Sequence, residues 1–430
     1  MRVISLPDMR LLKRLMIATV LILTVLALSI FVFLQQRVFG ADPANNRLAR
    51  VRQSKNYRDG SFQNLSPTNV TKKGVTTTKM IRDYLNKSPI NTPKSPLPSV
   101  KTDLNALPDD KPTLVWFGHS SYLIKTNGLA ILMDPVFSGS ASPVSFFGKS
   151  FPGTNEYSAA DMPPIDLLIM SHDHYDHLDY RTITQLIPKV KKFYTALGVG
   201  AHLERWGVPS DQIVEFDWWE GGPIAPGISL TATPARHFSG RSLARGKTLW
   251  ASYVLNLPGY TLFLGGDSGY DTHFRAIGDK YGPFDLAILE CGQYNQDWPT
   301  IHMFPEEVVT AAQDLRAIVV LPVHWGKFAL AYHAWNEPIQ RLTKRAAEQH
   351  LTVTTPKIGE SVVMGSAYPR TAWWNFQNKS QPENLIERVI ISLINSLTKQ
   401  SWQVSNVHPR PSGTARAWKA VAYYHRQVVY

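Results

Sequence analysis

The chain has 430 residues, of which 44% are hydrophobic and 11% aromatic, so a sizeable core is possible and wholesale disorder is excluded. The formal net charge is +12, but the excess lies at the two ends: residues 1–110 hold 17 Lys/Arg and 7 Asp/Glu, and residues 365–430 hold 8 and 2. The middle of the chain is slightly acidic, so a basic groove for nucleic acid on the folded domain is not expected.

An apolar stretch runs from Leu15 to Leu34, after a basic segment at residues 1–14. About twenty such residues span a bilayer as a helix. The sequence Phe39-Gly40-Ala41 is a poor cleavage site, so we expect an uncleaved single-pass anchor, with a removed signal peptide as the alternative. Lys and Arg flank both ends of the stretch; we favour an extracytoplasmic domain, although the positive-inside rule is close to a tie.

Residues 40–110 are rich in Asn, Ser, Thr, Pro and Lys, and prolines crowd the part after Asn86. This density argues against a long helix there, and leaves room for a short helix around Thr78–Asn86. We interpret residues 40–110 as a linker that wraps on the domain that follows.

Between residues 111 and 364, short apolar runs alternate with turn signals. The expected strands are Thr113–Phe117, Tyr122–Lys125, Leu129–Met133, Asp166–Met170, Ser229–Thr233, Ala251–Leu255, Thr261–Leu264, Ala287–Glu290 and Ile318–Leu321. Helices are expected after Asp179, over Pro305–Leu315 and over Glu337–His350. Two strand-rich halves with helices between them predict two packed sheets covered by helices.

Residues 365–430 form a C-terminal extension in this interpretation. The stretch Glu383–Leu397 has the apolar spacing of an amphipathic helix. Packing on the domain is the preferred role for this helix, ahead of membrane contact or self-association.

Four potential metal ligands follow the strand that ends at Met170. His172 and His174 alternate, so both point to one side of an extended segment, and Asp176 and His177 come directly after them. Imidazole and carboxylate groups suit zinc, and they also hold other divalent metals. Because one ion is unlikely to collect all four groups from so short a loop, we expect two metals, completed by later loops.

Three further ligand-type residues each stand just after an expected strand: His237, Asp267 and His324. Functional groups concentrate on such loops because the strands hold them rigidly. Three ligands at strand ends make an accidental surface histidine run a poor explanation.

The run from His172 to His177 resembles the H-x-H-x-D-H signature of the metallo-β-lactamase superfamily. Within that superfamily, residues 111–364 are most similar to the N-acylphosphatidylethanolamine-hydrolysing phospholipase D group. The segments that carry this similarity are Trp116–Ser121, Leu132–Val136, Pro234–Ser239 and His302–Glu307. The resemblance implies an α/β fold, a four-layer αββα sandwich, behind the N-terminal transmembrane helix.

The resemblance also implies a division of ligands between two zinc ions. One ion takes His172, His174 and His237, the second takes Asp176, His177 and His324, and Asp267 bridges both. Two such ions activate water and stabilise the charge that develops in phosphodiester hydrolysis. The candidate catalytic residues are Asp176, Asp267 and His302.

For several nearby residues the sequence allows two different roles. His119 orients the site or fills a turn, and His302 reaches the substrate or is a structural histidine. Asp134 supports a ligand histidine or is an ordinary turn carboxylate before Pro135. Trp325 and the pair Trp218-Trp219 are expected in the core rather than along an acyl-chain pocket.

These features favour a membrane-anchored zinc phosphodiesterase that acts on a phospholipid. One alternative has the same metal site but hydrolyses a different bond, that of a lactone, a thioester or a β-lactam. A second alternative is a metal-binding membrane protein without catalytic activity. The sequence leaves the oligomeric state open.

Overall fold

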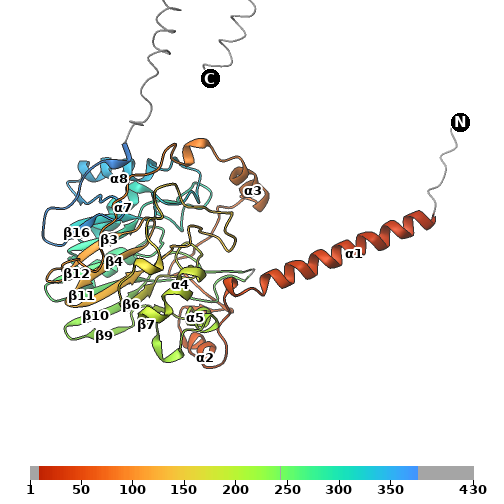
Figure 1. Cartoon of the computed structure of the whole chain (residues 1–430), viewed down its shortest axis with the longest axis horizontal. Coiled ribbons are helices and arrows are strands. Elements are labelled where there is room, and N and C mark those ends of the chain that lie inside the picture. Colours follow the sequence, from red (N-terminus) through yellow and green to blue (C-terminus); the bar gives the residue numbers. More distant parts are fainter. Residues whose placement is uncertain (1–8, 243, 376–430) are drawn as a thin grey trace, which may run out of the picture. The chain divides into compact units, whose positions relative to one another are not determined.

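Two seven-stranded sheets form the body of the computed structural model, which describes residues 9–242 and 244–375 (Figure 1). The first sheet has the strand order β16-β3-β4-β5-β6-β7-β8, antiparallel from β16 to β5 and parallel from β5 to β8. Its strands are β3 (Thr113–Trp116), β4 (Tyr122–Thr126), β5 (Leu129–Met133), β6 (Ile165–Met170), β7 (Val190–Ala196), β8 (Ile213–Phe216) and β16 (Ser361–Val363).

The second sheet has the order β15-β14-β13-β12-β11-β10-β9 and the same division into two halves. Strands β9 to β12 are antiparallel, and β12 to β15 are parallel. Its strands are β9 (Gly221–Ala225), β10 (Ile228–Thr233), β11 (Ser252–Leu257), β12 (Tyr260–Leu264), β13 (Leu286–Glu290), β14 (Val319–Val323) and β15 (Thr352–Val353).

Helices cover the sheets. Helices α4 (Tyr180–Leu186) and α5 (Gly200–Trp206) share a buried core cluster with the first sheet, to which they contribute Leu186, Leu203 and Trp206. Helices α6 (His273–Tyr281), α7 (Pro305–Asp314) and α8 (Glu337–Glu348) pack along the second sheet. The predicted αββα fold is confirmed. The helix predicted after Asp179 is also confirmed: it is α4, and the Asp179 side chain accepts from the Arg181 amide at its start.

All of the predicted strands are present, with ends that differ by one or two residues. Within the two large sheets, strands β7, β8, β9, β15 and β16 were not predicted. Strand β7 begins Val190-Lys191-Lys192, and β15 and β16 have two and three residues, so their apolar patterns are weak. The expected helix over Glu383–Leu397 lies outside the described residues.

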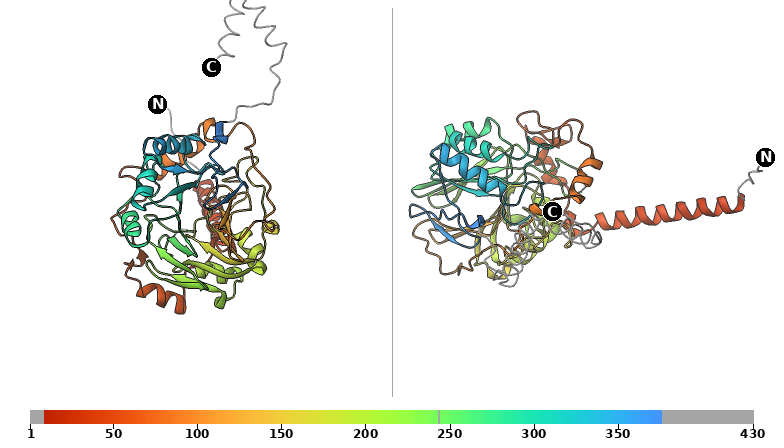
Figure 2. Two further views of the ribbon diagram at one scale, coloured as in Figure 1. Left: turned by 90° about the vertical axis from the view of Figure 1, so that its left-hand side faces the viewer. Right: turned by 90° about the horizontal axis from the view of Figure 1, so that it is seen from above.

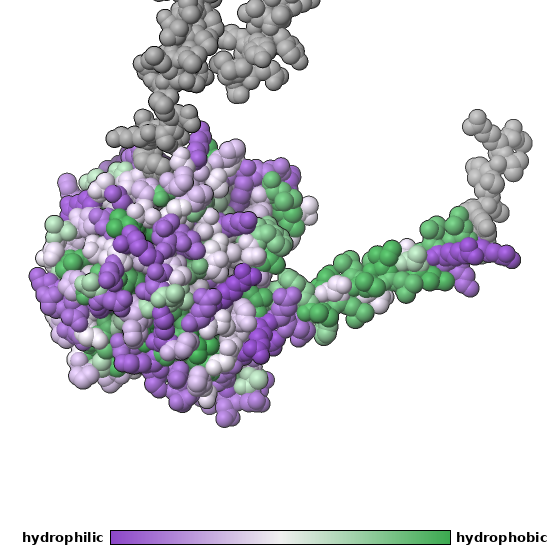
Figure 3. Space-filling view, in the orientation of Figure 1, coloured by the Kyte–Doolittle hydropathy of each residue, from purple (hydrophilic) through white to green (hydrophobic). Residues whose placement is uncertain are grey.

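The segment before the first sheet carries α1 (Met9–Leu34), α2 (Asn45–Gln53), α3 (Thr77–Leu85) and the short hairpin of β1 (Tyr57–Arg58) and β2 (Ser61–Phe62). Helix α1 has 26 residues and is long and apolar enough to cross a membrane (Figure 3). The prediction of a short helix around Thr78–Asn86 is confirmed by α3.

Residues 40–110 lie along the domain and bond to it. Arg47 pairs with Glu204 and Glu215, and the Asn64 side chain donates to the carbonyl of His237. The apolar side chains of Val51, Phe62, Leu97 and Leu104 are buried. This segment therefore contributes to the domain surface around the site described below.

The residues directly after α1 are also fastened to the domain. The carbonyl of Gln35 accepts from the Arg205 side chain, and that of Arg37 accepts from Nε1 of Trp206. Nη2 of Arg241 donates to the carbonyl of Val38 at 2.8 Å. In Figures 1 and 2 these residues and α3 lie on the same side of the two sheets.

Candidate metal centre and active site

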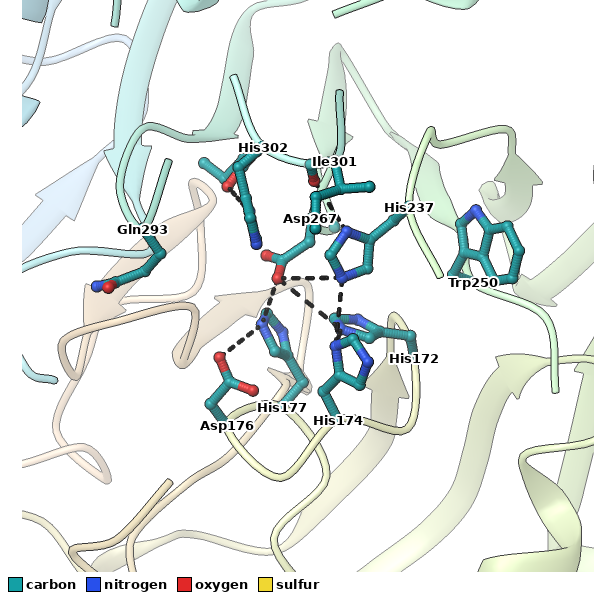
Figure 4. A network of polar contacts seen from close by, with 12 residues as sticks. His172, His174, Asp176, His177, His237, Trp250, Asp267, Gln293, Ile301 and His302 are labelled. Carbon is teal, nitrogen blue, oxygen red and sulfur yellow. Dashed lines mark hydrogen bonds and ion pairs between the residues drawn. The ribbon is translucent and has the colours of Figure 1, made fainter. Parts of the chain in front are cut away.

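The candidate ligands meet at one edge of the two sheets, where several strands end (Figure 4). The His172–His177 loop follows β6, His237 follows β10, Asp267 follows β12 and His324 follows β14. Because β10, β12 and β14 run in the same direction, their carboxyl ends lie at one edge of the second sheet. The amide of Ala251, before β11, donates to the Ser171 carbonyl and brings the first sheet to this edge.

A first cluster consists of three histidines. Nε2 of His172 lies 2.9 Å from Nδ1 of His174, and Nε2 of His237 lies 3.2 Å from the same atom. His172 and His237 are buried. The ligand atoms of all three lie within 4.8 Å of one another, which is the spacing that a single bound cation requires.

A second cluster contains Asp176, His177 and His324, together with His119. Nε2 of His119 lies 2.9 Å from Oδ2 of Asp176, and Nε2 of His177 lies 3.6 Å from that oxygen. The ring centroids of His119 and His324 are 4.0 Å apart. His119 therefore holds the Asp176 carboxylate and belongs to the centre itself, not only to a turn.

Asp267 stands between the two clusters. Its Oδ2 lies 3.2 Å from Nε2 of His177 and 3.7 Å from Nε2 of His237, and its Oδ1 lies 3.1 Å from Nδ1 of His324. Each cluster thus has a histidine within reach of the one carboxylate. This placement suits a ligand shared by two ions.

Two buried atoms test whether the residues fit metal ions. Nε2 of His177 and Oδ1 of Asp267 are both buried, and the ligand atoms that lie 3.2 Å and 3.1 Å from them are not aligned for a hydrogen bond, an arrangement that is costly unless another group binds them. Burial lowers the pKa of His172, His237 and His324 well below the usual range, so these rings are neutral and keep a free lone pair. The donor set therefore fits a pair of divalent cations.

Neighbouring groups direct the histidine nitrogens inward. Nδ1 of His177 donates to Oδ2 of Asp134 at 2.8 Å, and Nδ1 of His237 donates to the Ile301 carbonyl at 2.8 Å. Nδ1 of His172 lies 2.9 Å from Oγ of Ser171, which itself donates to Asp134. In each ring Nε2 is left to face the centre, a common arrangement in metal sites. Asp134 thus supports a ligand histidine.

Three residues of this centre have left-handed backbones. The φ angles are 53° at His119, 40° at Asp134 and 65° at His324. This backbone conformation is energetically unfavourable for residues other than glycine, so the surrounding contacts must stabilise it. The amide of His119 donates to the Trp325 carbonyl, and the amide of His324 donates to the His119 carbonyl, which joins the two turns.

His302 forms a pair with Glu290, a residue that was not predicted. Nδ1 of His302 lies 2.8 Å from Oε2 of Glu290, and Figure 4 shows the other end of the ring directed toward Asp267. Burial raises the pKa of Glu290. Burial lowers the pKa of His302, but the carboxylates of Glu290, Asp267 and Asp176 together outweigh it and raise that pKa. Glu290 could have been found as a charged residue that ends an otherwise apolar strand.

A cavity of about 380 Å³ opens onto the two clusters. Polar groups of the centre line its floor, and Arg245 lies on its wall. The apolar part of the lining comes from Val70, Val75, Met80, Phe238, Trp298, Ile301 and Leu330. Trp218 and Trp325 are buried in the core, as expected, and neither lines the cavity. The expectation was wrong for Trp219, which is 37% exposed and whose ring lies against the side chain of Lys280 instead of in the core. Cys291 is buried beside Glu290.

The chain was compared with known proteins. The family model described as "Beta-lactamase superfamily domain" matches residues 130–325. The uncharacterized protein Rv0906 of Mycobacterium tuberculosis is 40% identical over 340 residues, which cover 78% of this chain and 91% of the relative. The chain belongs to the metallo-β-lactamase superfamily. Its paired clusters fit the binuclear centre of a metal-dependent hydrolase.

Two other similarities are more distant. The N-acyl-phosphatidylethanolamine-hydrolyzing phospholipase D 1 of Caenorhabditis elegans is 31% identical over 228 residues, which cover 50% of this chain and 64% of the relative. The solved structure of Igni18, a metallo hydrolase from Ignicoccus hospitalis, has 22% identity and a TM-score of 0.48, and covers 60% of this chain and 100% of that chain.

Proposed function

We propose that the protein is a zinc-dependent phosphodiesterase of phospholipase D type that hydrolyses N-acylphosphatidylethanolamine-like lipids. The observation that carries the proposal is the cavity, because its apolar wall meets a two-cluster metal centre. The activity for which the C. elegans relative is named is consistent with this substrate class. All seven proposed ligands, five imidazoles and two carboxylates, are groups of the kind that zinc binds.

The ligand sets divide as the geometry groups them. His172, His174 and His237 would hold one ion, Asp176, His177 and His324 would hold the second, and Asp267 lies close to histidines of both sets. When bound, two such ions supply an activated water molecule and neutralise charge on the phosphoryl oxygens. Asp176 and Asp267 contribute the negative charge that keeps two cations close together, and His119 holds Asp176 in place.

His302 is positioned to act on the substrate. Its Nδ1 is engaged by Glu290, so its Nε2 is available at the cavity floor to donate to an oxygen of the phosphodiester. Arg245 lines the same cavity and offers a guanidinium group to an anionic headgroup. The two residues bind and orient the phosphodiester relative to the ligand clusters.

The apolar lining suits an acyl chain. Trp298 and Ile301 form a small core cluster with Ala331, against which Val70, Met80 and Phe238 pack. A hydrocarbon chain laid along these side chains would be removed from water, which contributes about 0.8 kcal/mol per buried methylene group. A small polar substrate would gain nothing from this wall.

The N-terminal helix supports a membrane location. We propose that α1 stays attached as a single-pass anchor and that the domain is extracytoplasmic, with phospholipid as the substrate and no nucleic-acid partner. The fastening of Gln35 and Val38 to the domain means that a cut after Ala41 would remove residues that are part of the fold. Protease access to the domain in sealed vesicles tests the orientation.

A lipid assay tests the function. The purified full chain, loaded with zinc in detergent, is incubated with N-acylphosphatidylethanolamine, and we expect release of phosphatidic acid. The His302→Gln variant should bind metal normally and release phosphatidic acid more slowly. Rapid hydrolysis of a lactone, thioester or β-lactam without phosphodiester turnover would contradict the proposal, and so would full metal loading without any hydrolysis.

A further inference from the structure

Exposed apolar side chains are concentrated at one place on the domain. Outside α1, nine large apolar residues in the described part of the chain are exposed. Five of them lie on α3, on the turn η2 (Pro89–Asn91) that follows it and on one loop of the domain: Ile81, Leu85, Ile90, Phe146 and Phe147. We call these five residues the α3 surface. Figure 3 shows apolar side chains gathered over α3.

The helix and the loop form one surface. The rings of Tyr84 and Phe147 stack with centroids 4.9 Å apart, which joins α3 to the loop. Ile81 and Leu85 are four residues apart and therefore share one face of the helix, where they are 56% and 76% exposed. Phe146 is also 76% exposed. A cluster of exposed apolar side chains on a face that contacts water indicates a binding surface.

The α3 surface adjoins the mouth of the cavity. Thr77 and Met80 of α3 line the cavity, and Met80 directly precedes Ile81. Helix α3 is held to the domain by the Lys79–Asp297 ion pair and by the Tyr332 hydroxyl, which donates to the Met80 carbonyl. The helix therefore has one side at the cavity and the other in solvent.

Charge around the α3 surface favours an anionic partner. Residues 71–94 contain six Lys/Arg and a single acidic residue, Asp83. Lys72, Lys73, Arg82 and Lys94 are exposed. Lys79 pairs with Asp83 and Asp297, and Nζ of Lys87 donates to the Ala329 carbonyl, so these two lysines serve the domain instead. Basic residues beside exposed apolar ones are typical of segments that lie in the interface of an anionic membrane.

The attachment of α1 fixes which side of the domain is near the membrane. The carbonyls of Gln35, Arg37 and Val38 accept hydrogen bonds from the domain directly after the helix ends. Gln35–Phe39 and α3 lie on the same side of the sheets (Figures 1 and 2). A bilayer crossed by α1 is thus next to the side that carries α3.

We propose that the α3 surface inserts into the headgroup region of a lipid bilayer and places the cavity mouth against the membrane. A phospholipid then enters the cavity from the bilayer without crossing water. The inference rests on the proposed function only for the identity of this lipid; the insertion itself is independent of the reaction.

The test uses the full chain reconstituted in vesicles of phosphatidylcholine and phosphatidylglycerol. Cys291 is the single cysteine and is buried, so an introduced cysteine is the accessible thiol. A nitrobenzoxadiazole label is placed in Ile81→Cys and in Phe146→Cys. The matched control is Ile318→Cys, because Ile318 is 57% exposed and precedes β14, at the end opposite His324. A Cys291 thiol that stays unreactive shows that each variant is folded.

We expect the emission of the labels at positions 81 and 146 to shift to shorter wavelength in vesicles, and spin-labelled lipids to quench both several-fold more than the label at position 318. Equal quenching at all three positions would overturn the proposal. A wavelength shift without lipid quenching would assign the α3 surface to a second copy of the chain, and would overturn it as well.

A kinetic measurement separates this inference from the proposed function. The Leu85→Glu variant should lose most of its turnover of long-chain lipid in vesicles and keep its turnover of a water-soluble short-chain phosphodiester. Quenching at positions 81 and 146 without any phosphodiester hydrolysis would support the membrane surface and contradict the function. If Leu85→Glu keeps its turnover of lipid in vesicles and the labels at positions 81 and 146 are not quenched, the membrane insertion of the α3 surface is contradicted and the proposed function is not.

Discussion

Oδ2 of Asp134 accepts a hydrogen bond from Nδ1 of His177 at 2.8 Å, and both side chains are completely buried. The Ser171 amide donates to the other carboxylate oxygen of Asp134. The carboxylate therefore fixes the ring of His177 and directs Nε2, which has no hydrogen-bond partner, into the second cluster.

This relationship predicts the effect of Asp134→Asn. The amide oxygen can still accept from the Ser171 amide, but the amide nitrogen cannot accept from Nδ1 of His177, so the ring loses its fixed orientation. We expect metal affinity or activity to fall about 10–100-fold. Competition with a chromophoric chelator measures the affinity, and circular dichroism in excess chelator provides the control for folding. Unchanged affinity in a folded variant would contradict the role of Asp134.

Asp267→Ala tests the shared ligand. Asp267 lies within 3.7 Å of histidines from both clusters, so its removal should weaken both sites and reduce bound metal from about two equivalents to one or fewer. Elemental analysis of the purified protein measures this ratio. Asp271→Ala is the matched control, because Asp271 lies on the same loop and pairs with Arg236 instead of a cluster histidine. Two retained equivalents in Asp267→Ala would rule out a bridging carboxylate.

Much of the site could be predicted because its ligands follow strong apolar strands. His237, Asp267 and His324 each stand a few residues after a strand, and the parallel arrangement of those strands then brings them to one edge. Glu290 stands at the same edge but was missed. It is the last residue of β13 and the one charged residue of that apolar strand, and its pairing with His302 is visible only in the structure.

The cavity wall could not be predicted from local pattern. Val70, Val75 and Met80 lie in a segment rich in Thr, Lys and Pro, whose composition is typical of a linker. Their position beside Trp298 and Phe238 depends on contacts more than 150 residues apart in the chain, such as the Asn64 side chain with His237. No sequence pattern identifies Arg241 either. In the structure it donates to the carbonyls of Asp173 and Val38 and so links the histidine loop to the residues after α1.

A substitution at Gly40 tests the link between the residues that follow α1 and the histidine loop. The Ala41 amide donates to Nδ1 of His202, whose Nε2 lies 3.2 Å from Oδ2 of Asp173, between the ligands His172 and His174. A Cβ atom at Gly40 would overlap the ring of His202. Gly40→Ala should therefore displace the ring, destabilise the fold by about 1–3 kcal/mol and weaken metal binding.

Gly60→Ala is the control for Gly40→Ala. Gly60 has φ 78° against 71° at Gly40, but a Cβ atom there meets nothing within 4 Å. Both positions have positive φ, so both variants carry a backbone cost, and only Gly40→Ala adds the overlap with His202. Thermal unfolding and chelator competition, compared between the two, give the result. Equal metal affinity in both variants would show that residues 35–41 do not support the histidine loop.

Lys327 gives the fold a pH dependence that is separate from the metal ligands. Its Nζ is buried and donates to the carbonyls of Val136 at 2.9 Å and Phe117 at 3.2 Å. Burial lowers the pKa of Lys327 to about 7, and the charge of Asp179 opposes this shift. An unfolded lysine has a pKa of about 10.4, so between pH 7 and 10 the unfolded chain binds more protons at this position than the folded chain.

Stability from this residue should therefore rise as the pH increases from 7 toward 10, by up to about 1.4 kcal/mol per pH unit. Below pH 7 both states carry the proton and the full cost of burying the charge remains. In Lys327→Met this slope should vanish, while the two carbonyls lose their donor and stability falls at high pH. Denaturant unfolding at pH 6, 7, 8 and 9 measures the difference between wild type and variant, with Lys192→Met, an exposed lysine on β7, as the control. A difference that stays constant across this range would mean that Lys327 keeps its proton in the folded protein.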